Sequence, residues 1–192
     1  IFLIGNSNHH ILNKSNLNLA LSYNFFPLQN MVEYFVKRRV KKLIIFSGAL
    51  IYGKKYIKLP VSEKQSVDGF QNNYLFSKYL SEELSKFYQS KLSIINIRLS
   101  NIYGPTLLKR PDLVQTLMKD ILSNKKEISV WSKEPKRDFI FAYDAAEAII
   151  KLLFSSYSGN LNLGSGKMYS VGKLCEYLTK ISGRKIIDLK KK

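Results

Sequence analysis

The chain has 192 residues, of which 45% are hydrophobic, and it carries a formal net charge of +17 at pH 7. This length and composition allow one buried core with a small second lobe and exclude a compositionally disordered chain. No apolar run approaches the roughly 18 residues of a membrane span, so a cytoplasmic protein is expected.

The positive charge raises the question of a nucleic-acid partner. Only 6 of the 31 basic residues are Arg, and the Lys residues are spread along the chain instead of forming an Arg-rich stripe. This spread favours solvated faces over a nucleic-acid interface, although the field still attracts small anions. The single Cys175 has no zinc-site spacing around it, so no metal is expected.

The first half of the chain alternates apolar runs of strand length with amphipathic stretches of helical length. Strands are expected at "IFLIG", "LIIFSG" and "LSIINIRLS", and helices at about 17–38 and 74–90. This order predicts the α/β class, with a doubly wound parallel sheet that is covered on both faces.

After Pro105 the pattern is looser. It predicts a helix near 112–124, strands at "ISVW" and "DFIF", a helix from Asp144 to about Phe154, a strand at "NLNLG", and a helix over 170–182 behind the cap-like Ser170. The chain opens at Ile1 within an apparent strand, without a Met or a glycine-rich turn before it. We therefore expect it to be an N-terminally truncated fragment.

The stretch "NNYLFSKYLSEEL" places Tyr74 and Lys78 four residues apart, on one face of the expected helix. An ammonium group beside a phenol favours the ionised phenol, which could then act as a base. Lowering a tyrosine pKa from about 10 to about 7 corresponds to roughly 4 kcal/mol. The alternative is that Tyr74 packs on a strand while the Lys78 side chain extends to water.

Four further stretches accompany this pair: "LIIFSGALIYG", "IRLSNIYGP", "KRDFIFAYDAAEAI" and "NLNLGSGKMYS". In this order and spacing the sequence resembles the NAD-dependent nucleotide-sugar epimerase/dehydratase family of the extended short-chain dehydrogenase/reductase superfamily. The resemblance implies a Rossmann-like sheet that lacks its first strands. It assigns residues 1–103 to the rest of the NAD-binding domain and 104–192 to a substrate-binding lobe, with about 137–155 returning to the first domain.

The resemblance also implies catalytic roles. Tyr74 would take a proton from a sugar hydroxyl, Lys78 would lower the pKa of Tyr74 and hold the cofactor, and Ser47 would bind the same hydroxyl. The usual Ser or Thr of the family falls at Gly48 here, so Ser47 would have to replace it. All three residues would contact NAD.

Four more residues are assigned by the same resemblance. Gly5 and Asn24 would lie at the cofactor, or else serve in a tight turn and a helix cap. Asn101 and Arg137 would bind the sugar diphosphate, for which a guanidinium group is well suited. Alternatively, Asn101 forms a turn and Arg137 pairs only with Asp144.

Dehydratases of the family carry an Asp-Glu pair where this chain has Ala49 and Leu50. The sequence therefore favours a UDP-hexose 4-epimerase that serves surface polysaccharide synthesis, with a nucleotide-sugar reductase or dehydratase as the alternative. A catalytically inactive binding or scaffold relative is the alternative of another class. The expected partners are a nucleotide sugar and, at full length, a second copy of the chain, whereas the fragment alone is expected to be inactive.

Overall fold

The computed structural model describes residues 1–14, 16–53, 56–106 and 112–191. The chain divides into two compact units. The first consists of Ile1–Ser100 and Glu147–Leu163, and the second of Asn101–Ala146 and Gly164–Lys192. The returning segment thus lies later than the expected 137–155, and the assignment of cofactor and sugar binding to the two parts stays a prediction.

A three-stranded sheet forms the centre of the first unit, in the order β1 (Lys42–Gly48), β2 (Ser93–Leu99) and β6 (Gly159–Leu163). Both strand pairs are parallel, so the expected α/β class and parallel sheet are confirmed. Ser47 and Gly48 lie at the carboxyl end of β1, the edge of open parallel sheets at which ligands bind.

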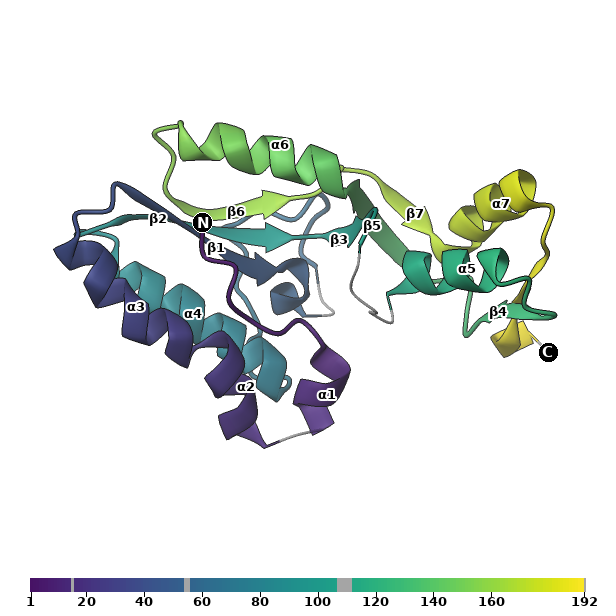
Figure 1. The fold of residues 1–192 in the computed structure, drawn as a ribbon, viewed down its shortest axis with the longest axis horizontal. Helices are drawn as coiled ribbons and strands as arrows, with labels where there is room; N and C mark the ends of the chain where they lie inside the picture. Colours follow the sequence, from purple (N-terminus) through teal and green to yellow (C-terminus); the bar gives the residue numbers. More distant parts are fainter. Residues whose placement is uncertain (15, 54–55, 107–111, 192) are drawn as a thin grey trace. The chain divides into compact units, whose positions relative to one another are not determined.

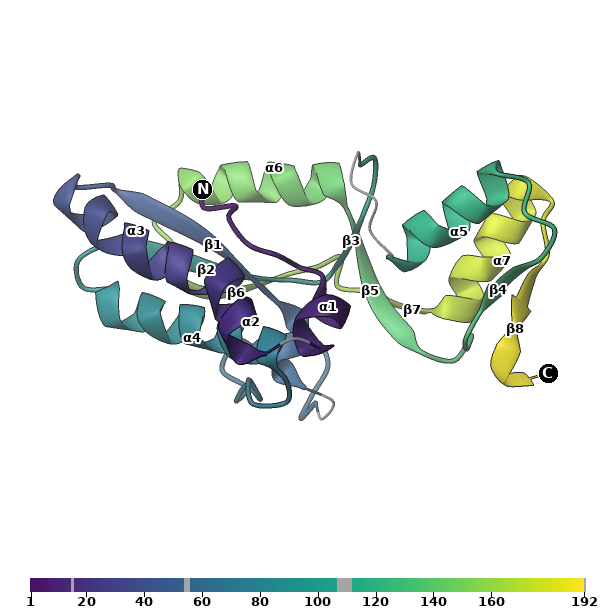
Figure 2. The same ribbon diagram turned by 60° about the horizontal axis from the view of Figure 1, so that its bottom comes forward.

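Helices cover both faces of this sheet (Figures 1 and 2). The helices α3 (Phe26–Lys37) and α4 (Asn73–Tyr88) lie on one face, and α6 (Ala142–Leu153) lies on the other. The buried core between α3 and the strands consists of Phe2, Leu28, Val32, Leu43, Ile45, Leu92 and Ile94. On the opposite face Ile149 of α6 packs against Ile44, Ile95 and Ile97. This two-sided burial explains why β1 and β2 read as continuous apolar runs.

The helix expected at 17–38 is split into α2 (Leu17–Asn24) and α3. Phe25 separates the two helices, and Pro27, which has no amide hydrogen to donate, lies in the first turn of α3. A short helix that the sequence did not predict, α1 (His9–Lys14), precedes them. Its Leu12 packs in a buried cluster with Ala20, Tyr74 and Leu75.

The prediction of a strand at "IFLIG" is wrong apart from one residue. Phe2 forms a single parallel bridge with Ile45, and its amide donates to the carbonyl of Ile44 at 2.9 Å. Beyond this bridge the chain leaves the sheet for α2, where the amide of Asn6 donates to the side chain of Asn24 at 2.8 Å. A hydrogen bond to a side chain of α2 therefore replaces the expected ladder.

The second unit is built from short strands. β3 (Asn101–Tyr103) is parallel to β5 (Lys136–Phe141), β7 (Met168–Ser170) is antiparallel to β5, and β4 (Ile128–Val130) is parallel to β8 (Ile186–Asp188). The helices α5 (Leu113–Leu122) and α7 (Val171–Ser182) enclose a core with the last strand pair, made of Leu117, Ile128, Val130, Val171, Cys175 and Ile186. Ser170 caps α7 as expected, since its side chain accepts from the amide of Lys173. Short 3₁₀ helices lie at Ala49–Tyr52 and Leu189–Lys191.

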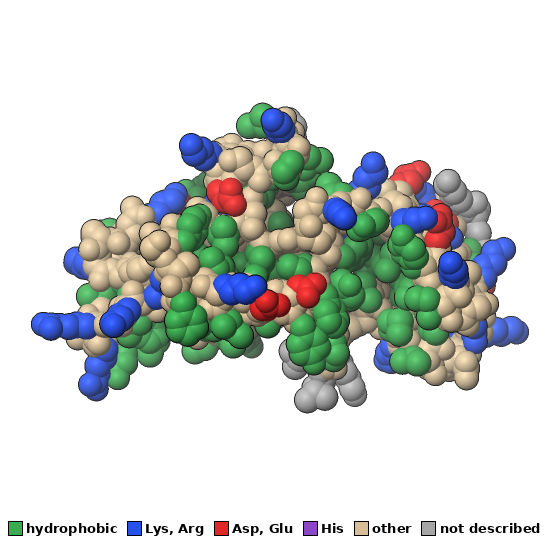
Figure 3. Space-filling model, turned by 90° about the horizontal axis from the view of Figure 1, so that it is seen from above, with side chains coloured by type: hydrophobic (Ala, Val, Ile, Leu, Met, Phe, Trp, Pro, Cys, Tyr) green, Lys and Arg blue, Asp and Glu red, His purple; other side chains and the backbone are tan. Residues whose placement is uncertain are grey.

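The surface and the helices add two observations. On the face drawn in Figure 3, Lys and Arg side chains stand dispersed among apolar and polar ones. Within the described ranges, every helix is too short or too polar to cross a bilayer.

Candidate active site

The helix α4 places Tyr74 in its first turn and Lys78 one turn later. Asn72 fixes this start, because its side chain accepts from the amide of Leu75 at 2.9 Å. The ring of Tyr74 is buried with Leu12 and Ala20, so it packs on helices and not on a strand. The Lys78 Nζ lies 6.0 Å from the centre of this ring.

Lys78 does not extend to water. Its Nζ donates to the carbonyl oxygen of Phe46 at 2.9 Å, which joins α4 to the end of β1. Burial of the ammonium group lowers the pKa of Lys78 to about 8. At pH 7 the side chain therefore keeps its charge in a place where that charge is costly, which is typical of functional lysines.

Ser47 follows Phe46 directly. The residue is buried, and among the described residues its Oγ has no hydrogen-bond partner. Buried hydroxyl groups are normally paired, because leaving one unpaired costs roughly 1–3 kcal/mol. An unpaired hydroxyl at the carboxyl end of β1 suits a polar group of a ligand.

Gly5 and Asn24 meet beside Lys78. A Cβ atom on Gly5 would lie 2.9 Å from Asn24 Oδ1 and 3.8 Å from Lys78 Nζ, so this position has no room for a side chain. Asn24 is buried and is not a helix cap, because its Oδ1 accepts from the amide of Asn6 and its Nδ2 donates to Ser77 Oγ at 3.3 Å. The side chain of Asn24 thus joins the N-terminal segment to α4.

Asn101 and Arg137 lie in the second unit. Asn101 begins β3 and is exposed, and its Nδ2 donates to the carbonyl of Asp138 at 3.2 Å. Arg137 is half-buried on β5, where it pairs in register with Tyr169. The alternative for Arg137 was an ion pair with Asp144. Both residues lie in the described part of the chain, and no ion pair joins them there. Asn101 and Arg137 belong to neighbouring strands of one sheet, because β3 and β5 pair.

The sequence interpretation missed a buried polar network around Arg98 of β2. Arg98 and Glu82 of α4 form an ion pair at 2.6 Å, and the exposed fractions of their side chains are 3% and 2%. A signal was present, because Arg98 is a charged residue inside the apolar run "IINIRLS". A buried charge requires a partner, and Glu82 follows Lys78 by one helical turn.

Together, the groups of the first unit can hold and polarise a hydroxyl-bearing ligand. A buried ammonium group, a phenol and an unpaired hydroxyl are the donor and acceptor types that proton transfer at an alcohol requires. Among the described residues, no three or more His, Cys, Asp or Glu side chains are grouped to hold a metal ion.

Residues 5–172 match the model of a family described as NAD dependent epimerase/dehydratase. A GDP-L-fucose synthase from Sinorhizobium fredii is 26% identical over 171 residues, which are 81% of this chain and 54% of that protein. A UDP-glucose 4-epimerase from Yersinia enterocolitica is 28% identical over 177 residues, 81% of this chain and 52% of that protein. The chain spans about half the length of these curated relatives.

Solved structures show the same fold. A UDP-N-acetylglucosamine 4-epimerase from Methanobrevibacter ruminantium, in complex with UDP-N-acetylmuramic acid, superposes with a TM-score of 0.88 at 21% identity, covering 97% of this chain and 62% of that one. A UDP-glucose 4-epimerase from Thermus thermophilus in complex with NAD gives 0.76 at 23% identity, covering 87% and 57%.

Proposed function

Because the chain belongs to the NAD-dependent epimerase/dehydratase family, we propose that it carries the catalytic residues of a nucleotide-sugar 4-epimerase acting on a UDP-hexose. The observation that carries this proposal is that two polar groups, one from Lys78 and one from Ser47, lie together at the carboxyl end of β1. The Lys78 ammonium group binds the Phe46 carbonyl, and the next residue, Ser47, has a buried hydroxyl without a partner among the described residues.

The residues present fit a dinucleotide at this edge of the sheet. Because a Cβ atom on Gly5 would meet Asn24 Oδ1 and approach Lys78 Nζ, only glycine lets the backbone pass this close to Lys78. Asn24 fixes the backbone that follows Gly5. We propose that Gly5, Lys78, Tyr74 and Ser47 line the cofactor and that Asn24 acts mainly by holding residues 5 and 6. NAD, when bound, supplies reversible hydride acceptance for the oxidation of a sugar alcohol.

The chain's own residues would then handle the proton. Tyr74, kept ionisable by the nearby Lys78 ammonium group, takes the proton of the sugar hydroxyl as the alcohol is oxidised, and returns it when the ketone is reduced. The hydroxyl group of Ser47 donates a hydrogen bond to the same oxygen and so orients the sugar hydroxyl. We propose Asn101 and Arg137 as diphosphate ligands, because Arg137 pairs with no carboxylate among the described residues.

The segment after Ser47 supports epimerisation over dehydration. Removal of water needs an additional acid and base, but Ala49 and Leu50 begin a 3₁₀ helix here and bring no carboxylate. A nucleotide-sugar reductase is the second candidate, as the resemblance of the sequence implies. The polysaccharide role and the cytoplasmic location stay predictions from the sequence.

Incubating the full-length protein and NAD with UDP-glucose or UDP-galactose tests the proposed reaction. We expect interconversion of the two sugars, which nuclear magnetic resonance (NMR) of the sugar protons can monitor. A 4-keto-6-deoxy sugar product would overturn epimerisation in favour of dehydration. Consumption of NADPH with a 4-keto sugar substrate would identify a reductase, and failure to bind NAD would support the inactive binding relative.

Replacing Ser47 by Ala should separate function from stability. Removal of a buried, unpaired hydroxyl is expected to leave the free energy of unfolding unchanged or to raise it by about 1 kcal/mol. Turnover should nevertheless fall by about 10²- to 10³-fold, as for loss of one hydrogen-bond donor to the reacting oxygen. Denaturant unfolding and kcat measured on the same samples check both parts. A matched control is Ser129→Ala in β4 of the second unit, which should alter neither quantity.

We also propose that the full-length protein is a homodimer that pairs through α3 and α4. The exposed aromatic side chain of Phe87 and a hollow lined by Gln29, Asn30, Glu33, Leu84, Phe87 and Tyr88 on these helices support this surface. Replacing Phe87, which is 72% exposed, by Glu should convert the dimer to a monomer. Sedimentation velocity would contradict the proposal if the unaltered protein were monomeric.

A further inference from the structure

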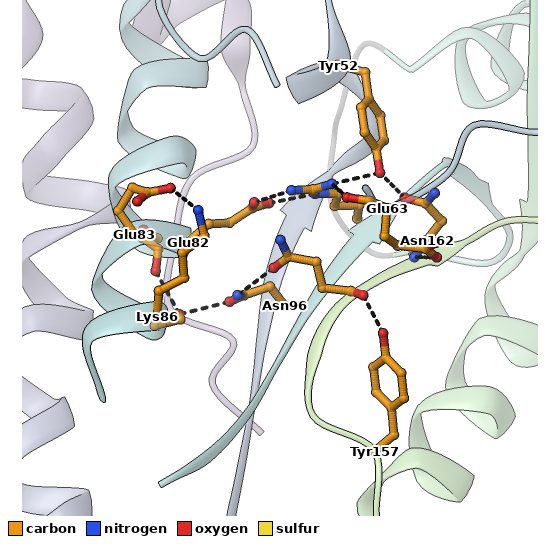
Figure 4. A network of polar contacts seen from close by, with 12 residues as sticks. Tyr52, Glu63, Glu82, Glu83, Lys86, Asn96, Tyr157 and Asn162 are labelled. Carbon is orange, nitrogen blue, oxygen red and sulfur yellow. Dashed lines mark hydrogen bonds and ion pairs between the residues drawn. The ribbon is translucent and has the colours of Figure 1, made fainter. Parts of the chain in front are cut away.

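The guanidinium group of Arg98 lies inside the first unit and forms hydrogen bonds in two directions. Its Nε and Nη2 donate to the two carboxylate oxygens of Glu82 at 3.1 and 2.6 Å. Its Nη1 donates to the hydroxyl of Tyr52 at 2.7 Å and to the carbonyl of Glu63 at 3.2 Å. Figure 4 shows Glu82 on one side of this network and Tyr52, Glu63 and Asn162 on the other.

The first arm of the network fixes α4. Tyr74, Lys78 and Glu82 are spaced four residues apart, so they lie along one stripe of the helix. Lys78 binds β1 through the Phe46 carbonyl, and Glu82 binds β2 through Arg98. Two anchors one turn apart, on adjacent strands, determine both the rotation of α4 about its axis and its position along that axis.

The second arm fixes the turn that follows Ser47. Arg98 is the register partner of Ser47 across the parallel ladder, so both side chains point to the same face of the sheet. Tyr52 ends the 3₁₀ helix that begins directly after Gly48, and its ring lies 4.8 Å from the guanidinium carbon. The Tyr52 hydroxyl donates in turn to Asn162 Oδ1 of β6 at 2.7 Å.

We propose that Arg98 is a positioning residue that sets the register of α4, with Tyr74 and Lys78, against the end of β1, with Ser47. It acts through Glu82 and Tyr52 and needs no contact with the reacting atoms. A bidentate guanidinium suits this role, because it holds two elements at fixed angles, which an ammonium group cannot do. The catalytic meaning of this register rests on the proposed function, whereas the register itself is a property of the fold.

The decisive variant removes both charges at once, Arg98→Met with Glu82→Leu. Replacing a buried ion pair by apolar side chains of similar size commonly preserves stability. We expect the melting temperature to be kept within a few degrees while kcat falls by about 10²-fold, as for a displacement of roughly 1 Å at the reacting groups. The KM should change much less. The control is the exposed pair Glu147 and Lys151 of α6, replaced by Leu and Met, which should leave kcat unchanged.

A readout without turnover separates this inference from the proposed function. The pKa of Lys78 reports its burial against β1 and can be followed by NMR of the ¹³C-labelled lysine side chain, assigned with Lys78→Met. In the double variant we expect this pKa to rise from about 8 toward the ordinary value of 10.5. If it rises in a protein that shows no epimerisation, the proposed function fails and the positioning role stands.

Tyr52→Phe gives a second test if the double variant does not fold. This change keeps both charges and the aromatic ring, and removes only the hydroxyl that links Arg98 to Asn162. We expect kcat to fall about 10-fold, whereas Tyr157→Phe, which removes a hydroxyl bonded to the Asn160 carbonyl, should have no such effect. The proposal would be overturned if the folded double variant kept both its kcat and the pKa of Lys78 unchanged. If the double variant does not fold, the same result in Tyr52→Phe would overturn it.

Discussion

Replacing Tyr74 by Phe is expected to lower turnover by about 10²- to 10⁴-fold, the usual contribution of a positioned proton-transfer group. The ring of Tyr74 packs with Leu12, Ala20 and Leu75, and Phe keeps all of this apolar contact. The fold and the melting temperature should therefore change little. The assay is the interconversion of UDP-glucose and UDP-galactose, with NAD binding measured in parallel to show that the cofactor site is intact.

Tyr79→Phe is the matched control for this experiment. Tyr79 lies on the same helix, one residue after Lys78, and its side chain packs against Gly69 and Phe70. Because it lies on a different face of α4, loss of its hydroxyl should leave turnover unchanged. Full activity in Tyr74→Phe, or equal losses in both variants, would show that the phenol of Tyr74 is not the base.

The long elements of the first unit were predictable because their patterns are strong. The apolar runs at β1 and β2 are filled from both faces, and α4 begins behind an Asn cap, so the sequence carries the signal for each one locally. The split at Phe25 was missed because the apolar stripe of residues 17–38 continues through it. Strands such as β3 and β7 were missed because three residues are too few to establish a period.

A site residue could be recognised in the sequence only where its relation to another residue is local. Tyr74 and Lys78 were visible because their relation is local, four residues on one helix. The contact of Lys78 with Phe46 and the bond of Asn24 to Asn6 join residues 32 and 18 positions apart, and no periodicity encodes them. Arg98 was recognisable as an anomaly in a buried strand, but its partners Glu82 and Tyr52 come from different elements and could only be found in three dimensions.

Lys78→Met is expected to change activity and stability in opposite directions. Turnover should fall at least 10²-fold, because the ammonium group that favours the ionised Tyr74 is lost. Stability should increase, because burial that lowers the pKa of Lys78 from 10.5 to about 8 opposes folding of the charged form, by at most about 3 kcal/mol. Loss of the hydrogen bond to the Phe46 carbonyl offsets about 1 kcal/mol of this gain.

The pH dependence gives the sharper form of this prediction. Below pH 8 the side chain of Lys78 is charged in both the folded and the unfolded chain, so the folded protein bears the full cost of the buried charge. Between pH 8 and 10.5 the folded state has lost this proton and the unfolded state has kept it, so the free energy of unfolding rises with pH. The stability advantage of Lys78→Met should therefore be largest below pH 8 and should shrink as the pH approaches 10.5. Urea unfolding of both proteins at pH 7 and pH 10, without added ligand, measures it. An advantage independent of pH would mean that the ammonium group is solvated, and it would remove the physical basis for assigning Lys78 a costly functional role.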